Sequence, residues 1–130
     1  MVVAPDTSVW IDFLRGGDDG VARELRRLLL RREVLLLGPV RLELLAGASR
    51  SGAQRLGKLL RPLPLVYPEA ATWTRAEAWA LRGARAGAGF GLADLLIGAL
   101  CSEHGATLWT RDADFTRMAA LGLLELHAPA

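Results

Sequence analysis

The sequence predicts an α/β domain with a mainly parallel sheet, because short apolar runs alternate along the chain with longer segments whose apolar residues recur at helical spacing. Glycine and proline end these segments at regular intervals, and neither an internal repeat nor a linker interrupts the series. We therefore expect a single domain over residues 1–130, with right-handed crossovers joining successive strands.

The first strand and the first helix follow from the residues around the first proline. Residues 2–4 are apolar, and Pro5 should end their strand because proline has no N–H to give to a sheet. The Asp-Thr-Ser sequence at 6–8 can cap a helix that begins at Val9, and the glycine pair at 16–17 stops this helix.

The same two signals, apolar spacing and breaking residues, predict the other elements. Residues 92–103 are apolar almost all round, which is typical of a buried helix, and a glycine-rich loop precedes them. The expected helices are residues 21–29, 40–46, 52–60, 69–85, 92–103 and 115–121, and the further expected strands are residues 34–37, 63–67, 107–110 and 123–126.

The composition excludes several classes of protein. With 52% hydrophobic and 23% charged residues and a net charge of +2, the chain is globular and mildly basic, which permits a nucleic-acid partner without establishing one. No apolar run reaches the roughly 18 residues of a membrane span, and the N-terminus lacks the pattern of a signal peptide. Cys101 is the only cysteine, which excludes an internal disulfide and a cysteine-based zinc site. We therefore expect a cytoplasmic protein that does not bind membranes.

Acidic residues fall where the carboxyl ends of the expected strands meet, which is where ligands bind in parallel sheets. Asp6 directly follows the first strand, and Asp112 and Asp114 follow the fourth. Glu43 lies in the helix after the second strand, and Asp94 lies near the start of the expected buried helix. We therefore expect these side chains to face the same edge of the sheet.

Each of these acids also has a purely structural interpretation. Asp6 and Asp112 could cap the helices that follow them, Glu43 could be a solvated helix residue, and Asp94 could be stabilised by a helix dipole. Several carboxylates at one edge, however, raise one another's pKa unless a cation offsets their charge. Mg²⁺ and Mn²⁺ prefer such oxygen ligands, and a metal ion held there can polarise a phosphodiester.

Four segments of the chain resemble the motifs of PIN-domain ribonucleases, in particular VapC-type toxins of bacterial toxin–antitoxin pairs. They occur in the right order, at plausible spacing, and together span nearly the whole chain. The four segments are residues 6–16, 39–47, 91–99 and 110–115.

The resemblance implies a PIN-like doubly wound domain, with helices on both faces of a mainly parallel central sheet, that cleaves RNA endonucleolytically with Mg²⁺ or Mn²⁺. It implies that Asp6 and Asp94 are the direct metal ligands. Glu43 and Asp112 would complete the catalytic set by binding a second ion or orienting water. The last acid of the family stands at the position of Asp112 or of Asp114; we favour Asp112 and keep Asp114 as a possible addition. Two hydroxyl residues, Thr7 and Ser8, could position water or a phosphate oxygen, with helix capping as the alternative.

The resemblance also implies partners: an RNA substrate, a second copy of the chain in a homodimer, and a cognate small antitoxin that inserts a helix into the acidic groove. The main alternative is a non-catalytic PIN-fold module that binds RNA or protein. A receiver-type signalling domain is disfavoured because such a domain needs a lysine after a late strand, and the only lysine, Lys58, does not follow one.

Other charged residues are expected outside the site. Asp12 is interpreted as a solvated helix residue, and the positions of His104 and His127 favour surface or helix-end roles, which disfavours a ribonuclease built on paired histidines. Several arginines could grip RNA phosphates or simply be solvated; they are Arg15, Arg82, Arg85 and Arg111.

Overall fold

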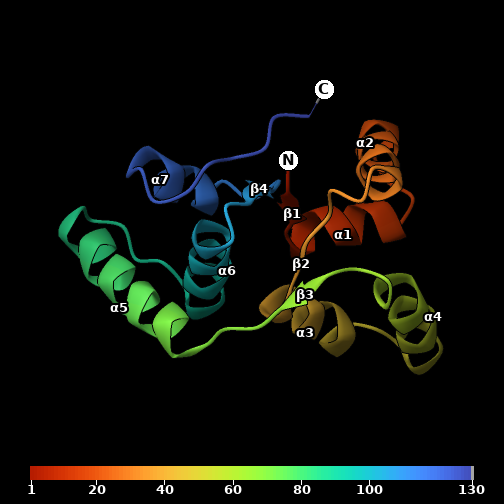
Figure 1. Cartoon of the computed structure of the whole chain (residues 1–130), viewed down its shortest axis with the longest axis horizontal. Helices are drawn as coiled ribbons and strands as arrows, with labels where there is room; N and C mark the ends of the chain where they lie inside the picture. The colour runs from red at the N-terminus through yellow and green to blue at the C-terminus, as the bar shows by residue number, and fades with distance from the viewer. Residues whose placement is uncertain (130) are drawn as a thin grey trace.

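The computed structural model describes residues 1–129. This part of the chain forms seven helices around short strands (Figure 1). The strands are β1 (Val3–Pro5), β2 (Leu36–Leu37), β3 (Leu65–Val66) and β4 (Thr107–Trp109). The helices are α1 (Thr7–Leu14), α2 (Asp19–Leu30), α3 (Gly38–Ala46), α4 (Arg50–Leu60), α5 (Ala70–Arg85), α6 (Leu92–Glu103) and α7 (Asp114–Ala120).

The strands lie parallel to one another. β1 pairs with β4, with Val3 opposite Thr107, and β2 pairs with β3. Two isolated parallel bridges, Val3 to Val34 and Leu108 to Leu126, connect β1 to the segment before β2 and β4 to the C-terminal tail. The order across the sheet is therefore β3, β2, β1, β4 and tail. This order confirms the predicted α/β fold with a parallel sheet.

Four of the expected strands are shorter than the sequence suggested, and the segment at 107–110 ends one residue early, at Trp109. Only parts of segments 34–37 and 63–67 are paired, and segment 123–126 contributes a single bridge instead of a strand. The tail nevertheless stays on the sheet, because the His127 N–H donates to the Leu108 carbonyl at 2.8 Å. β1 ends at Pro5. At this last position, the lack of a backbone N–H does not remove a hydrogen bond from the pairing with β4.

Several of the helices begin next to a capping side chain. Asp6 caps α1 as expected, and its side chain accepts from the Val9 N–H. Ser49 caps α4, which therefore begins at Arg50 instead of residue 52. Glu69 is the cap of α5 rather than its first residue. Only α6 has the predicted bounds at both ends.

The core lies where the sheet meets the helices on either side of it. In Figure 1, α6 and α7 lie on one side of β1 and β4, α1 and α2 lie on the other, and α5 packs against α6. Residues 95–101 of α6 are all buried, which confirms that this helix is internal. Trp10 of α1 and Phe115 of α7 are among the largest fully buried side chains. Among the described helices, none has the length and apolar character to cross a membrane.

The interpretation of His127 as a surface residue is wrong. Its side chain is only 5% exposed, and its Nε2 lies 2.8 Å from Oε2 of Glu24 on α2. Glu24 is itself buried and also pairs with Arg27 at 2.6 Å. The imidazole also meets the Trp109 ring edge-on. These contacts fix the tail against α2, because a buried carboxylate needs charged or hydrogen-bonding partners.

Candidate active site

Asp6 stands at the bottom of the site, at the junction of β1 and α1. It is 3% exposed. Its Oδ1 accepts hydrogen bonds from the Ser8 hydroxyl at 2.5 Å and the Val9 N–H at 3.2 Å, and its Oδ2 accepts from the Thr110 hydroxyl. Burial raises the pKa of Asp6, while the hydrogen bonds from Ser8, Thr110 and Val9 act in the opposite direction. The protein's own donors therefore orient both oxygens of this carboxylate.

Two hydroxyls connect Asp6 to the loop between β4 and α7. The Ser8 Oγ accepts from the Arg111 N–H at 3.0 Å, and the Thr110 Oγ1 accepts from the Asp112 N–H at 2.9 Å. Sequence reasoning considered Ser8 and overlooked Thr110. The available signal was a hydroxyl residue directly after the fourth strand, within the segment of the fourth motif.

The acids of the site converge on Asp94, in the first turn of α6. Burial is the first cause that raises its pKa to about 6, and the negative charges of the other four acids add to it. In order of effect, these acids are Asp112, Asp114, Glu43 and Asp6. The expectation that acids from separate strand ends meet at one edge is therefore supported by mutual repulsion at Asp94.

Three of these carboxylates are close enough to share one cation. Asp94, Asp112 and Asp114 each offer an oxygen within 4.8 Å of the others. Asp112 Oδ1 accepts the Asp114 N–H at 2.9 Å, and Asp114 forms an ion pair with Arg117 at 2.7 Å. The structure thus brings both candidates for the fourth acid into the same group. Asp6 lies outside this group of three, although its charge reaches Asp94.

Glu43 forms the outer side of the site. It is exposed on α3, and its Oε1 accepts the Thr7 hydroxyl at 2.7 Å. This bond joins α3 to the first residue of α1, next to Asp6. The Thr7 hydroxyl therefore orients a carboxylate in the site.

The donor set fits a divalent hard cation. Every candidate ligand is a carboxylate oxygen, which Mg²⁺ and Mn²⁺ prefer, and the oxygens of Asp94, Asp112 and Asp114 lie within 4.8 Å of one another. A cation among these three carboxylates would relieve the repulsion at Asp94.

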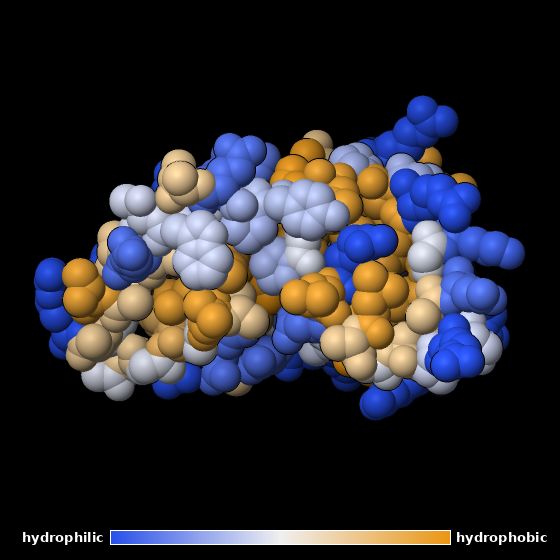
Figure 2. Space-filling model, turned by 90° about the horizontal axis from the view of Figure 1, so that it is seen from below, coloured by the Kyte–Doolittle hydropathy of each residue, from blue (hydrophilic) through white to orange (hydrophobic). Residues whose placement is uncertain are grey.

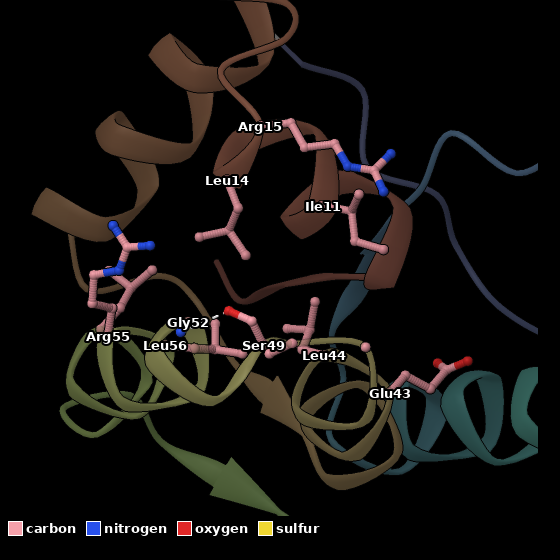
Figure 3. A pocket seen from close by; sticks show the side chains of 12 residues that line it. Ile11, Leu14, Arg15, Glu43, Leu44, Ser49, Gly52, Arg55 and Leu56 are labelled. Atoms are coloured by element: carbon pink, nitrogen blue, oxygen red, sulfur yellow. Dashed lines mark hydrogen bonds between the residues drawn. The ribbon is translucent and has the colours of Figure 1, made fainter.

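A groove runs away from Glu43 between α1, α3 and α4 (Figure 3). Its volume is about 490 Å³, and apolar side chains such as Ile11, Leu44 and Leu56 line much of it. Figure 3 shows Glu43 at one end of this groove and Arg55 at the other. The groove thus joins an apolar trough to the acidic site.

The sequence is similar to known PIN-domain proteins over almost its whole length. The PIN domain family model matches residues 3–121. Over 125 residues the chain is 35% identical to Ribonuclease VapC11 of Mycobacterium tuberculosis, a match that covers 92% of this chain and 93% of the relative. VapC ribonuclease Mb1587 of Mycobacterium bovis matches with the same identity and coverage.

Two solved structures illustrate the likeness in fold. The crystal structure of VapBC2 from Rickettsia felis, bound to a DNA fragment from its promoter, matches with a TM-score of 0.79 and 18% identity over 98% of each chain. That of FitAcB from Neisseria gonorrhoeae matches with a TM-score of 0.77 and 21% identity, also over 98% of each chain. These likenesses bear on the fold. Together with the family match and the mycobacterial relatives, they lead to one conclusion: this chain belongs to the PIN-domain family, among its VapC-type ribonucleases.

Proposed function

We propose that this chain is the toxin of a toxin–antitoxin pair and a metal-dependent endoribonuclease of the cytoplasm, with Mg²⁺ as its cofactor and Mn²⁺ as a substitute. The observation that carries the proposal is the cluster of carboxylates in which Asp94, Asp112 and Asp114 each offer an oxygen within 4.8 Å of the others. Membership of a family whose relatives at 35% identity are ribonucleases supports the same activity.

In this proposal Asp94, Asp112 and Asp114 hold the cation. The resemblance implies that Asp6 is also a direct ligand; it lies outside this group of three, and its negative charge supports the cation from behind, either directly or by its effect on Asp94. A divalent cation there would polarise the scissile phosphodiester and lower the pKa of the attacking water. The hydroxyls of Ser8 and Thr110 keep the Asp6 carboxylate in one orientation. Because fixed carboxylates need no reorganisation when the substrate binds, this network would lower the barrier to cleavage.

Glu43 and Arg15 would act on the substrate side of the site. The Thr7 hydroxyl holds the Glu43 carboxylate at the exposed edge, where it would orient the attacking water and accept its proton. Arg15 lines the groove that begins at Glu43, so its guanidinium is placed to contact an RNA phosphate. RNA would therefore enter along this groove.

The same groove would receive the antitoxin. An amphipathic helix could lay its apolar side on Ile11, Leu44 and Leu56, which leaves its polar end near Glu43. A basic residue at that end would meet the carboxylates and displace the cation. The solved structure of a toxin–antitoxin complex from Klebsiella pneumoniae shares this fold, with a TM-score of 0.77 at 19% identity, and it supports an antitoxin as partner.

A second apolar surface would join two copies of the chain. Leu42 and Leu92 are each 68% exposed and Tyr67 is 57% exposed, and all three line a hollow of about 450 Å³ between α3 and the start of α6. The face of the molecule in Figure 2 carries apolar patches divided by polar side chains. Because large exposed apolar side chains are typical of interfaces, we assign this hollow to a homodimer.

The test is cleavage of structured RNA by the purified chain. We expect cleavage with Mg²⁺ or Mn²⁺, its loss with excess EDTA, and its return when Mg²⁺ is added beyond the chelator. Asp94→Asn should be inactive, whereas Asp19→Asn, which removes an equal charge from the exposed start of α2, should remain active. RNA binding without cleavage under every metal would contradict the proposal and favour the non-catalytic module.

A further inference from the structure

Arg111, in the loop between β4 and α7, is held at both its backbone and its side chain by one face of α1. Its N–H donates to the Ser8 Oγ at 3.0 Å, and its Nη1 lies 2.8 Å from Oδ1 of Asp12. Ser8 and Asp12 are four residues apart in α1, so they lie on the same side of the helix. One helical face therefore anchors a single loop residue twice.

Asp12 is itself held in place, so the interpretation of this residue as solvated is wrong. Its side chain is 21% exposed, and its Oδ2 accepts the Asp18 N–H at 3.1 Å. The Gly17 N–H donates to the Asp12 carbonyl at 3.0 Å. A Cβ at position 17 would lie 2.4 Å from Asp12 Oδ1, so glycine leaves the room that the carboxylate occupies. Contacts from the α1–α2 turn thus hold one carboxylate oxygen of Asp12, while Arg111 pairs with the other.

The anchored loop carries two acids of the site. Thr110 is bonded to Asp6, Arg111 is bonded to α1, and Asp112 and Asp114 follow within three residues. Loss of the ion pair between Arg111 and Asp12 would leave this loop tied to the site by the Thr110 hydroxyl and by the bond from the Arg111 N–H to Ser8, among the contacts found at residues 110–112. Movement of the loop would shift Asp112 and Asp114 relative to Asp94.

We propose that Asp12 and Arg111 are positioning residues that set the place of Asp112 and Asp114 in the cation site. The proposal rests on the proposed function, since it assigns these acids to the cation. It also gives Arg111 a role different from a grip on RNA phosphate, because the guanidinium is already engaged by Asp12.

The experiment compares Asp12→Asn, Arg111→Gln and the double variant with wild type in three measurements. These are Mn²⁺ affinity by calorimetry, the Mg²⁺ concentration for half-maximal cleavage, and RNA affinity in EDTA. Residues that orient metal ligands through hydrogen bonds affect metal affinity by about tenfold or more, so we expect each single variant to weaken Mn²⁺ binding by about tenfold. RNA affinity in EDTA should stay unchanged. The double variant should equal either single variant, because each removes the same contact.

The matched controls are Asp19→Asn and Arg23→Gln, which change the same charges at exposed positions of α2. Mn²⁺ affinities of the test variants equal to those of these controls would overturn the proposal. Weaker RNA binding in EDTA for Arg111→Gln alone would also overturn it, and would make Arg111 a phosphate-binding residue. Arg111→Lys and Asp12→Glu, which keep the charges, should fall between wild type and the neutral variants. Failure of the wild type to cleave RNA would instead contradict the proposed function, and the Mn²⁺ comparison would still test the positioning role.

Discussion

The bottom and the rim of the acidic site hold their carboxylates in opposite ways. At the bottom, Asp6 is buried and its oxygens accept bonds from Ser8, Val9 and Thr110. At the rim, burial and then the charges of four other carboxylates raise the pKa of Asp94. Hydrogen bonds therefore offset part of the effect of burial on the charge of Asp6, whereas a cation would offset the repulsion at Asp94. Asp6 is thus held by hydrogen bonds within the protein, whereas Asp94 is placed to interact with a bound cation.

The largest expected effect distinguishes these two parts by stability as well as activity. Asp6→Asn and Asp94→Asn should each lower the rate of RNA cleavage by about 100-fold or more, because each changes a charge of the cation site. In EDTA, however, Asp6→Asn should lower the free energy of unfolding by about 1–2 kcal/mol, since an amide nitrogen cannot accept the bonds that the carboxylate accepts. Asp94→Asn should leave this free energy unchanged or raise it, since it removes repulsion.

Cleavage assays and urea denaturation of both variants in EDTA make this comparison. The exposed change Asp19→Asn serves as the control for the loss of one charge. An equal loss of unfolding free energy in the two variants would show that Asp6 and Asp94 contribute to stability in the same way. The contrast between the bottom and the rim of the site would then be wrong.

A second prediction concerns the different contributions of Asp112 and Asp114, the two acids in the loop after β4, to cleavage. Asp114 is paired with Arg117 at 2.7 Å and its side chain is 52% exposed, so part of its charge is already offset. Asp112 accepts the Asp114 N–H and has a larger effect on the pKa of Asp94. Asp112→Asn should therefore slow cleavage by about 100-fold and Asp114→Asn by about tenfold. Single-turnover cleavage rates of the two variants provide the measurement, and the reverse order would make Asp114 the principal fourth acid.

The sequence predicted the elements whose signals are long and local. Helix α6 has the expected bounds because its apolar residues are buried all round and glycine precedes it. Strands of two or three residues gave a much weaker signal, since pairing across the sheet decides how many residues they contain. The tail at 123–126 is apolar like a strand, yet it contributes only one bridge.

The site also combines features that local sequence predicts with contacts that depend on the folded structure. The acids could be predicted to meet because the carboxyl ends of parallel strands lie at one edge of the sheet. The partners that orient them could not, because these contacts join residues far apart in sequence: Thr110 and Asp6 are separated by 104 positions. The pairing of Asp12 with Arg111 likewise depends on how α1 packs beside β4 and not on any local pattern.

The smallest expected effect is a pH dependence that isolates the repulsion at Asp94. The pKa of this carboxyl is raised from 3.8 to about 6 in the folded chain, so the unfolded chain loses its proton first as the pH rises. In EDTA, the stability of the wild type relative to Asp94→Asn should therefore be greatest below about pH 4 and fall by about 1 kcal/mol as the pH rises to 7, a value reduced for solvent screening. Millimolar Mg²⁺ should reverse the fall, because it binds the ionised folded site. Urea titrations across this range test the effect, and a rise in relative stability with pH in EDTA would show that the charge of Asp94 is already stabilised without a cation.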